Sequence, residues 1–149
     1  MSLREKLVAD VKIAMKARQA GKLELTTLRM VMAAIKNKEI DAKVEISDDD
    51  IIEIIVKGIK MRQESLVEYE KADREDQVEQ LHQEIAILKR YLPEQLGEGE
   101  VRRLAEETIE AVGAQGPKDM GKVMGAMMPK VKGKADGKLV NKIVQELLS

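Results

Sequence analysis

The chain contains no cysteine, no phenylalanine and no tryptophan, and its only tyrosines are Tyr69 and Tyr91. Without cysteine there is no disulfide, no thiolate metal site and no cysteine nucleophile. The 149 residues are 44% hydrophobic, so the core must be built from Leu, Ile, Val, Ala and nine Met. Side chains of this kind pack well between helices, whereas strands usually draw on aromatic and β-branched residues. The composition therefore favours a helical protein.

Signatures of catalysis and of metal binding are also missing. His82 is the only histidine, and with Glu79 it has the spacing of dinuclear carboxylate sites in bundles, which need a second such pair. The segment Gly133–Lys138 resembles a phosphate-binding loop, but it has one residue too few between its glycines and follows a predicted helix. No serine lies in a Gly-x-Ser-x-Gly motif. We therefore predict no catalytic residue, no metal and no cofactor.

The sequence has no long apolar run. None approaches the roughly 20 residues that span a bilayer, and the first ten residues, MSLREKLVAD, are charged from the fourth onward. A secretory leader would need an apolar stretch there. These features predict a cytoplasmic protein that is not associated with a membrane.

Every long segment has an apolar period near 3.6, and none alternates cleanly. Ser2 with Glu5 is a capping-box pattern, Gly21 is a natural helix stop, and Ser47 precedes three aspartates that suit the start of a helix. The sequence thus predicts an all-α fold. The expected helices cover about residues 2–21, 23–42, 47–70, 76–92, 98–112, 117–129 and 136–148.

The dipeptide Leu92-Pro93 is the best candidate for a domain boundary. Proline removes a backbone donor and biases the preceding residue away from the helix, and Gly97 and Gly99 follow shortly after. We therefore expect an N-terminal helical hairpin or bundle over residues 1–92. A small three-helix domain is expected over residues 93–149.

The net charge of −1 conceals alternating blocks. Residues 1–43 carry +5, residues 44–79 carry −7, residues 93–116 carry −4 and residues 117–149 carry +4. One interpretation is solubility together with complementation of helix ends. The other is that the two basic blocks bind a polyanion. The composition leaves both open.

The last basic block has the clearest pattern. Seven lysines lie between two short predicted helices and on their flanks, and only Asp119 and Asp136 accompany them in that stretch. If the two helices pack as a hairpin, the amines can converge at its turn and bind phosphates with release of counterions; otherwise they form a solvated face. With only two tyrosines for stacking, we expect a folded RNA recognised by shape and backbone. The predicted nucleic-acid-binding residues are Lys118, Lys122, Lys130, Lys132, Lys134, Lys138 and Lys142.

Four methionines repeat on one face of the sixth predicted helix: Met120, Met124, Met127 and Met128. Such a stripe is most often core. The alternative is an adaptable groove that binds a partner protein.

Three stretches of the chain resemble one known family. They are LRMVMAAIKNKEID at Leu28–Asp41, YLPEQL at Tyr91–Leu96, and DMGKVMGAMMPKVKGKADGKLVNKIVQELL at residues 119–148. The third is the most specific, through its Lys-Gly-Lys-Ala-Asp-Gly core. Over essentially its whole length the chain resembles the GatB/YqeY family, which shares the C-terminal tail of the B subunit of glutamyl/aspartyl-tRNA amidotransferase. It is most like the small YqeY-type proteins.

The resemblance implies an all-helical N-terminal domain followed by a three-helix, ubiquitin-associated-like (UBA-like) domain. It also implies a role, because such a tail helps to hold transfer RNA while other parts of the amidotransferase perform the chemistry. We therefore expect a tRNA-binding accessory module with tRNA as its partner. The alternative is a helical adaptor that docks on an aminoacyl-tRNA synthetase or amidotransferase.

The family's reaction is the glutamine-dependent amidation of misacylated tRNA, a carbon–nitrogen ligase activity with glutamine as amido-N-donor. The chain resembles only the tail and lacks the catalytic parts of the larger enzyme. We therefore do not expect that activity from this chain alone, and its sequence leaves open any other activity.

Overall fold

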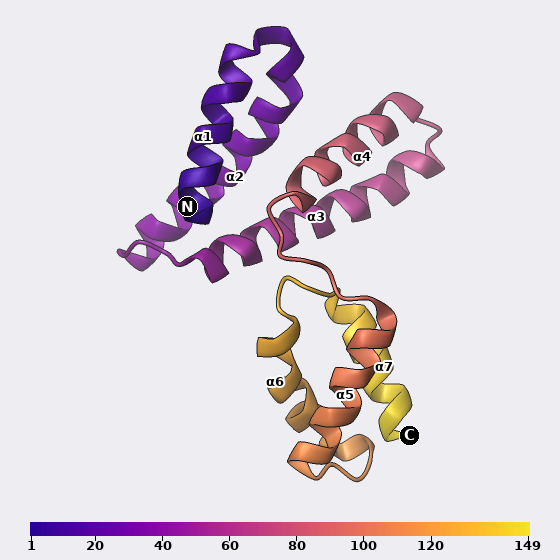
Figure 1. Cartoon of the computed structure of the whole chain (residues 1–149). Coiled ribbons are helices and arrows are strands. Elements are labelled where there is room, and N and C mark those ends of the chain that lie inside the picture. The colour runs from indigo at the N-terminus through magenta and orange to yellow at the C-terminus, as the bar shows by residue number, and fades with distance from the viewer. The chain divides into compact units, whose positions relative to one another are not determined.

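The computed structural model describes all residues from Met1 to Ser149. It contains seven α-helices, two short 3-10 helices and no strand (Figure 1), which confirms the predicted all-α fold. The chain divides into two compact units, Met1–Leu92 and Pro93–Ser149. Each unit encloses a separate hydrophobic cluster.

The first unit consists of two helical hairpins. Helix α1 (Leu3–Lys16) packs on α2 (Lys22–Ala42), and α3 (Asp48–Lys71) packs on α4 (Glu75–Lys89). Their apolar faces meet in a core without phenylalanine or tryptophan, so aliphatic side chains do nearly all the packing. The fully buried residues of this core include Leu7, Leu28, Ile51, Ile55 and Leu88.

The two predicted serine caps begin the helices as expected. The Ser2 hydroxyl accepts a hydrogen bond from the backbone of Glu5, whose side chain accepts from the Ser2 backbone. Ser47 and Asp50 form the same reciprocal pair at the start of α3. Each capping box satisfies backbone donors that the first turn leaves without a helical partner.

Helix α1 ends earlier than the sequence predicts. It stops at Lys16. Arg18, the first residue of the 3-10 turn η1 (Arg18–Gly21), adopts a left-handed φ of 51°. This turn brings Gly21 so close to α1 that a Cβ there would lie 2.3 Å from the Ala14 carbonyl oxygen. The prediction that the first helix continues to Gly21 is therefore wrong. Close packing between α1 and α2 determines where α1 ends.

Tyr91 joins the end of the second hairpin to α1. Its ring is buried, its hydroxyl donates to the Asp10 carboxylate, and the Lys6 ammonium lies 5.3 Å from the ring centroid. Burial, and then the hydrogen bond to Asp10, raise the pKa of Tyr91 above its ordinary value. The phenol therefore stays protonated and holds its hydrogen bond across the range in which proteins are usually studied.

Glu39 links the C-terminal end of α2 to the N-terminal end of α1. Its carboxylate accepts a hydrogen bond from the backbone N–H of Ile46 at 2.9 Å and pairs with Arg4. The hydrogen bond from Ile46 and the neighbouring Arg4 lower the pKa of Glu39, although burial opposes them. Glu39 therefore orders the connection between α2 and α3.

The second unit contains α5 (Glu98–Val112), the 3-10 turn η2 (Pro117–Asp119), α6 (Met120–Val131) and α7 (Gly137–Leu148). Its core is again aliphatic and includes Val101, Val123, Met127, Val140 and Val144, all fully buried.

Pro129 lies inside α6. The sequence predicts that the helix ends or kinks near this proline, but the helix continues for two more residues, to Val131. Pro129 cannot donate to the carbonyl of Gly125, and both residues are exposed, so water can satisfy that carbonyl. The helix therefore ends two residues beyond Pro129, near the predicted end.

Replacing Gly21 with alanine is expected to destabilise the first unit, because the new Cβ would overlap the Ala14 backbone, which cannot move cheaply. We expect a loss of about 1–3 kcal/mol in the free energy of unfolding, measured by urea titration. Gly58→Ala is the matched control, because a Cβ at Gly58 meets its nearest atoms at 3.4 and 3.7 Å. Equal stability of Gly21→Ala and wild type would contradict the close approach.

Replacing Glu39 with glutamine is expected to weaken the pH dependence of stability. The folded-state pKa of Glu39 is lowered from its ordinary value of 4.5, so its carboxylate stabilises the fold above that value and loses this effect as the pH falls through the folded-state pKa. Wild type should therefore lose more stability than Glu39→Gln between about pH 7 and pH 3, measured by urea unfolding. Glu45→Gln is the control, since Glu45 contacts the same Arg4 but is 77% exposed. The same flattening in both variants would contradict this role.

Candidate nucleic-acid interface

The lysine-rich connection between α6 and α7 is a short, ordered turn. After α6 ends, Lys132 leaves the helical conformation and Gly133 takes a left-handed φ of 74°, which glycine adopts without steric cost. Asp136 then caps α7 by accepting a hydrogen bond from the Lys138 backbone at 3.1 Å. The glycine and aspartate of the family motif thus shape the turn.

The backbone of this connection is attached to the residues that precede α5. The backbone N–H of Leu96 donates to the Lys134 carbonyl at 2.8 Å, and the Gln95 side-chain amide donates to the Gly133 carbonyl at 2.7 Å. The same amide donates to the Pro93 carbonyl. These bonds fix the carbonyls on the inner side of the turn. The side chains of Lys132 and Lys134 remain exposed.

Gln95 and Leu96 had no predicted role in the site. Both lie in the YLPEQL stretch that supports the family resemblance. Their partners lie 38 residues further along the chain, so helix periodicity gave no indication of the contact. The motif itself was the only signal.

The seven predicted lysines are all exposed but do not form one cluster. Lys134 lies in the turn, and Lys138 and Lys142 follow on one face of α7 at a spacing of four residues. Lys118 and Lys122 lie instead where α6 begins, at the end of the helix away from the turn (Figure 1). From Lys122 to the last turn of α6 the helix rises by about 12 Å. The expectation that all seven amines converge at the turn is therefore not met.

Lys130 is held by a neighbouring helix. Its ammonium donates to the hydroxyl of Thr108 on α5 at 3.0 Å. Thr108 is completely buried, and its own hydroxyl proton goes to the Leu104 carbonyl at 2.7 Å. Lys130 therefore connects α6 to α5, and contact with a ligand would compete with that hydrogen bond.

The three acids of the segment 117–149 are engaged elsewhere. Asp119 accepts from the Gln115 backbone, Asp136 caps α7, and Glu146 pairs with Arg102 at 2.9 Å. No ion pair joins a carboxylate to any of five lysines. The five are Lys118, Lys122, Lys134, Lys138 and Lys142.

The methionine stripe of α6 belongs mostly to the core. Met127 is fully buried, Met120 and Met124 pack against the hydrophobic cluster, and only Met128 is exposed, at 41%. The interpretation as core is therefore correct for three of the four side chains. The stripe as a whole does not offer a groove for a partner protein.

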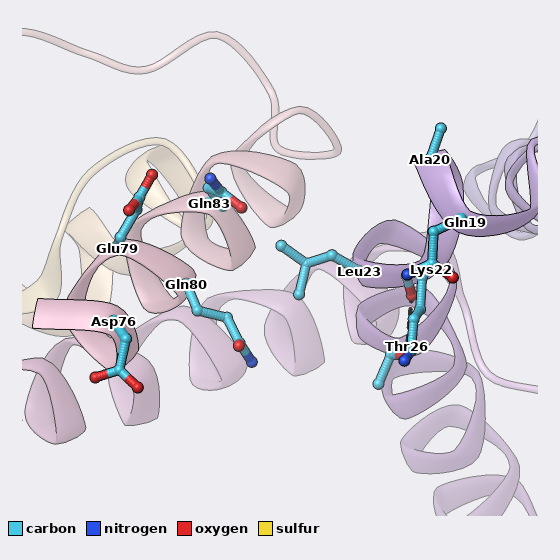
Figure 2. Close-up of a pocket in the computed structure, with 9 residues that line it drawn as sticks. All are labelled: Gln19, Ala20, Lys22, Leu23, Thr26, Asp76, Glu79, Gln80 and Gln83. Atoms are coloured by element: carbon cyan, nitrogen blue, oxygen red, sulfur yellow. Dashed lines mark hydrogen bonds between the residues drawn. The ribbon is translucent and has the colours of Figure 1, made fainter. Parts of the chain in front are cut away.

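The first unit contains a polar cleft of about 620 Å³ between the start of α2 and α4. Figure 2 shows Leu23 and Gln80 reaching into it from opposite sides. Lys22 lines one side, and Asp76 and Glu79 line the other. The two carboxylates make this cleft unfavourable for a phosphate group.

No group of three or more His, Asp or Glu side chains is arranged to hold a metal ion. No helix is both long enough and apolar enough to cross a membrane.

Comparison with curated proteins gives relatives that are named mitochondrial. "Altered inheritance of mitochondria protein 41, mitochondrial" of Kluyveromyces lactis is 42% identical over 86 residues, which is 57% of this chain and 45% of that protein. The protein of the same name from Pyrenophora tritici-repentis is 34% identical over 121 residues, 80% of this chain and 65% of that protein. The one from Lachancea thermotolerans is 40% identical over 87 residues, 58% of this chain and 46% of that protein.

These three relatives are named as mitochondrial proteins, which contradicts the predicted cytoplasmic location. The chain spans about half to two thirds of the length of these relatives.

The comparison with family models gives a match over nearly the whole chain. The model described as "Yqey-like protein" matches residues 4–148. This range includes both units and all three stretches on which the resemblance rests. The chain therefore belongs to the YqeY-like protein family.

Proposed function

We propose that this chain is a tRNA-binding accessory module, related to the tail of the glutamine-dependent tRNA amidotransferase. In this proposal the second unit binds the phosphate backbone of a folded RNA and performs no chemistry on it. The observation that carries the proposal is the row formed by Lys134, Lys138 and Lys142, which is exposed and makes no ion pair with a carboxylate.

The geometry of this row suits a phosphate backbone. Lys138 and Lys142 lie on one face of α7, about 6 Å apart along the helix axis, which is close to the spacing of successive phosphates along a strand. Lys134 is exposed in the turn that precedes α7. Lys132 lies beside it, and Lys118 and Lys122 provide a second, separate pair of amines.

The aromatic content supports recognition by shape. The segment 93–149 has no aromatic side chain, and Tyr91 in the first unit is buried. Single-stranded RNA is usually recognised by stacking its bases on aromatic rings. The proposed ligand is therefore a folded RNA such as tRNA, bound through its backbone.

Binding to tRNA is expected to depend steeply on salt. Each phosphate neutralised by a lysine releases counterions, so affinity measured by gel shift or fluorescence anisotropy should fall as KCl rises from about 50 to about 200 mM. Three contacts predict a slope of log K against log salt of about −2 to −3. Absence of binding at about 50 mM salt with micromolar protein would contradict the proposal.

Replacing Lys134, Lys138 and Lys142 with alanine should weaken tRNA binding at low salt by at least about tenfold. Each replacement should also reduce the salt slope by about one, while the circular dichroism spectrum stays unchanged. Lys130→Ala serves as an internal comparison, because it removes the hydrogen bond to Thr108 and should lower stability more than it alters the salt slope.

Lys89→Ala controls for a general loss of positive charge, because Lys89 is exposed on α4 in the first unit. An unchanged salt slope in the triple variant, or an equal loss of binding in Lys89→Ala, would contradict the assignment of the contact to the turn and α7.

A further inference from the structure

The outward face of α3 carries an ordered series of charges. Six exposed residues follow one another at helical spacing along this face and are called here the α3 seam. They are Glu53, Lys57, Lys60, Glu64, Glu68 and Lys71.

The charges of the α3 seam are ordered so that a second, antiparallel copy of the seam has the opposite sign at each position. Read from the start of α3 the signs are minus, plus, plus, minus, minus, plus; read from the end, every sign is opposite. An antiparallel copy of the seam therefore places unlike charges together at all six positions. The centre of that arrangement lies near residue 62. Lys60 meets the partner's Glu64, and Lys57 meets the partner's Glu68.

Exposed apolar side chains border the seam on both edges. Val56 and Val67 lie on one edge, 38% and 49% exposed, and Met61 lies on the other, 58% exposed. A two-fold axis perpendicular to antiparallel helices brings each edge against the same edge of the partner. Val56 then lies beside the partner's Val67, and Met61 lies beside the partner's Met61.

The surface next to Met61 leaves room for such a contact. An apolar groove of about 540 Å³ lies between α2 and α3, and its lining includes Met30, Ala34, Ile54 and Met61. Methionine side chains are flexible and fill irregular spaces of this kind well. A second Met61 can therefore be buried there.

The charged residues at the centre of the seam form no ion pairs within α3. Lys60 and Glu64 are four residues apart, yet no ion pair joins them, and Lys57 has none either. A lysine that precedes a glutamate is the weaker orientation of such a pair on a helix. Glu68 does pair with Lys71, but both side chains are more than 70% exposed, so that pair is readily exchanged.

We propose that α3 pairs antiparallel with α3 of a second copy of this chain, through the α3 seam and its two apolar edges. One helix pair buries less surface than the roughly 1,200 Å² of a standard stable interface. The dimer is therefore a reversible one that forms at high protein concentration, and it does not require RNA.

The test is sedimentation equilibrium of the nuclease-treated full chain over about 5 to 500 µM, a range suited to a weak interface. The average mass of wild type should rise from 16.7 kDa toward twice that value. Lys60→Glu and Glu64→Lys should each raise the dissociation constant at least about tenfold, because each places like charges together twice.

Mixing the two variants gives the sharpest result. Lys60→Glu and Glu64→Lys restore unlike charges across a mixed dimer, so the equimolar mixture should associate within about threefold of wild type. The double variant Lys60→Glu/Glu64→Lys should associate similarly. A change in helix stability alone would not be rescued by mixing.

Lys89→Glu is the matched control, an equal charge reversal on α4 that should leave association unchanged. A monomeric wild type throughout the concentration range would overturn the proposal. So would single variants that associate like wild type, or variants whose association is not restored on mixing.

Discussion

The candidate site depends on the attachment of the α6–α7 turn to the residues before α5. Two hydrogen bonds, from Leu96 and from the Gln95 amide, hold the carbonyls of Lys134 and Gly133. The left-handed Gly133 lies in the turn, and Asp136 caps the helix that follows it, so local contacts support the turn at both points. The lysines on it are therefore presented from a fixed backbone, and little entropy is lost by ordering that backbone on binding.

The charges around the turn leave Lys134, Lys138 and Lys142 without an ion pair to a carboxylate. Asp119 accepts from the Gln115 backbone, Asp136 caps α7 and Glu146 pairs with Arg102. Lys130 contacts the buried hydroxyl of Thr108. In the α3 seam, by contrast, three acids and three lysines balance one another and are bordered by exposed Val and Met. The first arrangement is suited to a polyanion and the second to a complementary protein surface, which here is a second copy of the chain.

Local features were predictable from the sequence, and contacts between distant elements were not. The caps at Ser2, Ser47 and Asp136 use neighbours two or three residues away, and burial of Met127 follows from helix periodicity. The early end of α1 depends on packing against α2. The roles of Lys130 and Gln95 depend on partners 22 and 38 residues distant. Lys118 and Lys122 lie away from the turn because they are at the start of α6, whereas the turn follows its end.

The most direct measurement is an NMR titration of the isotope-labelled full chain with a purified tRNA at low salt, observing the backbone amides. Binding through the turn and α7 predicts chemical-shift changes concentrated in residues 132–142, which disappear when salt is raised. Changes confined to the first unit, or none at micromolar concentrations, would contradict the assignment of the RNA contact to this surface.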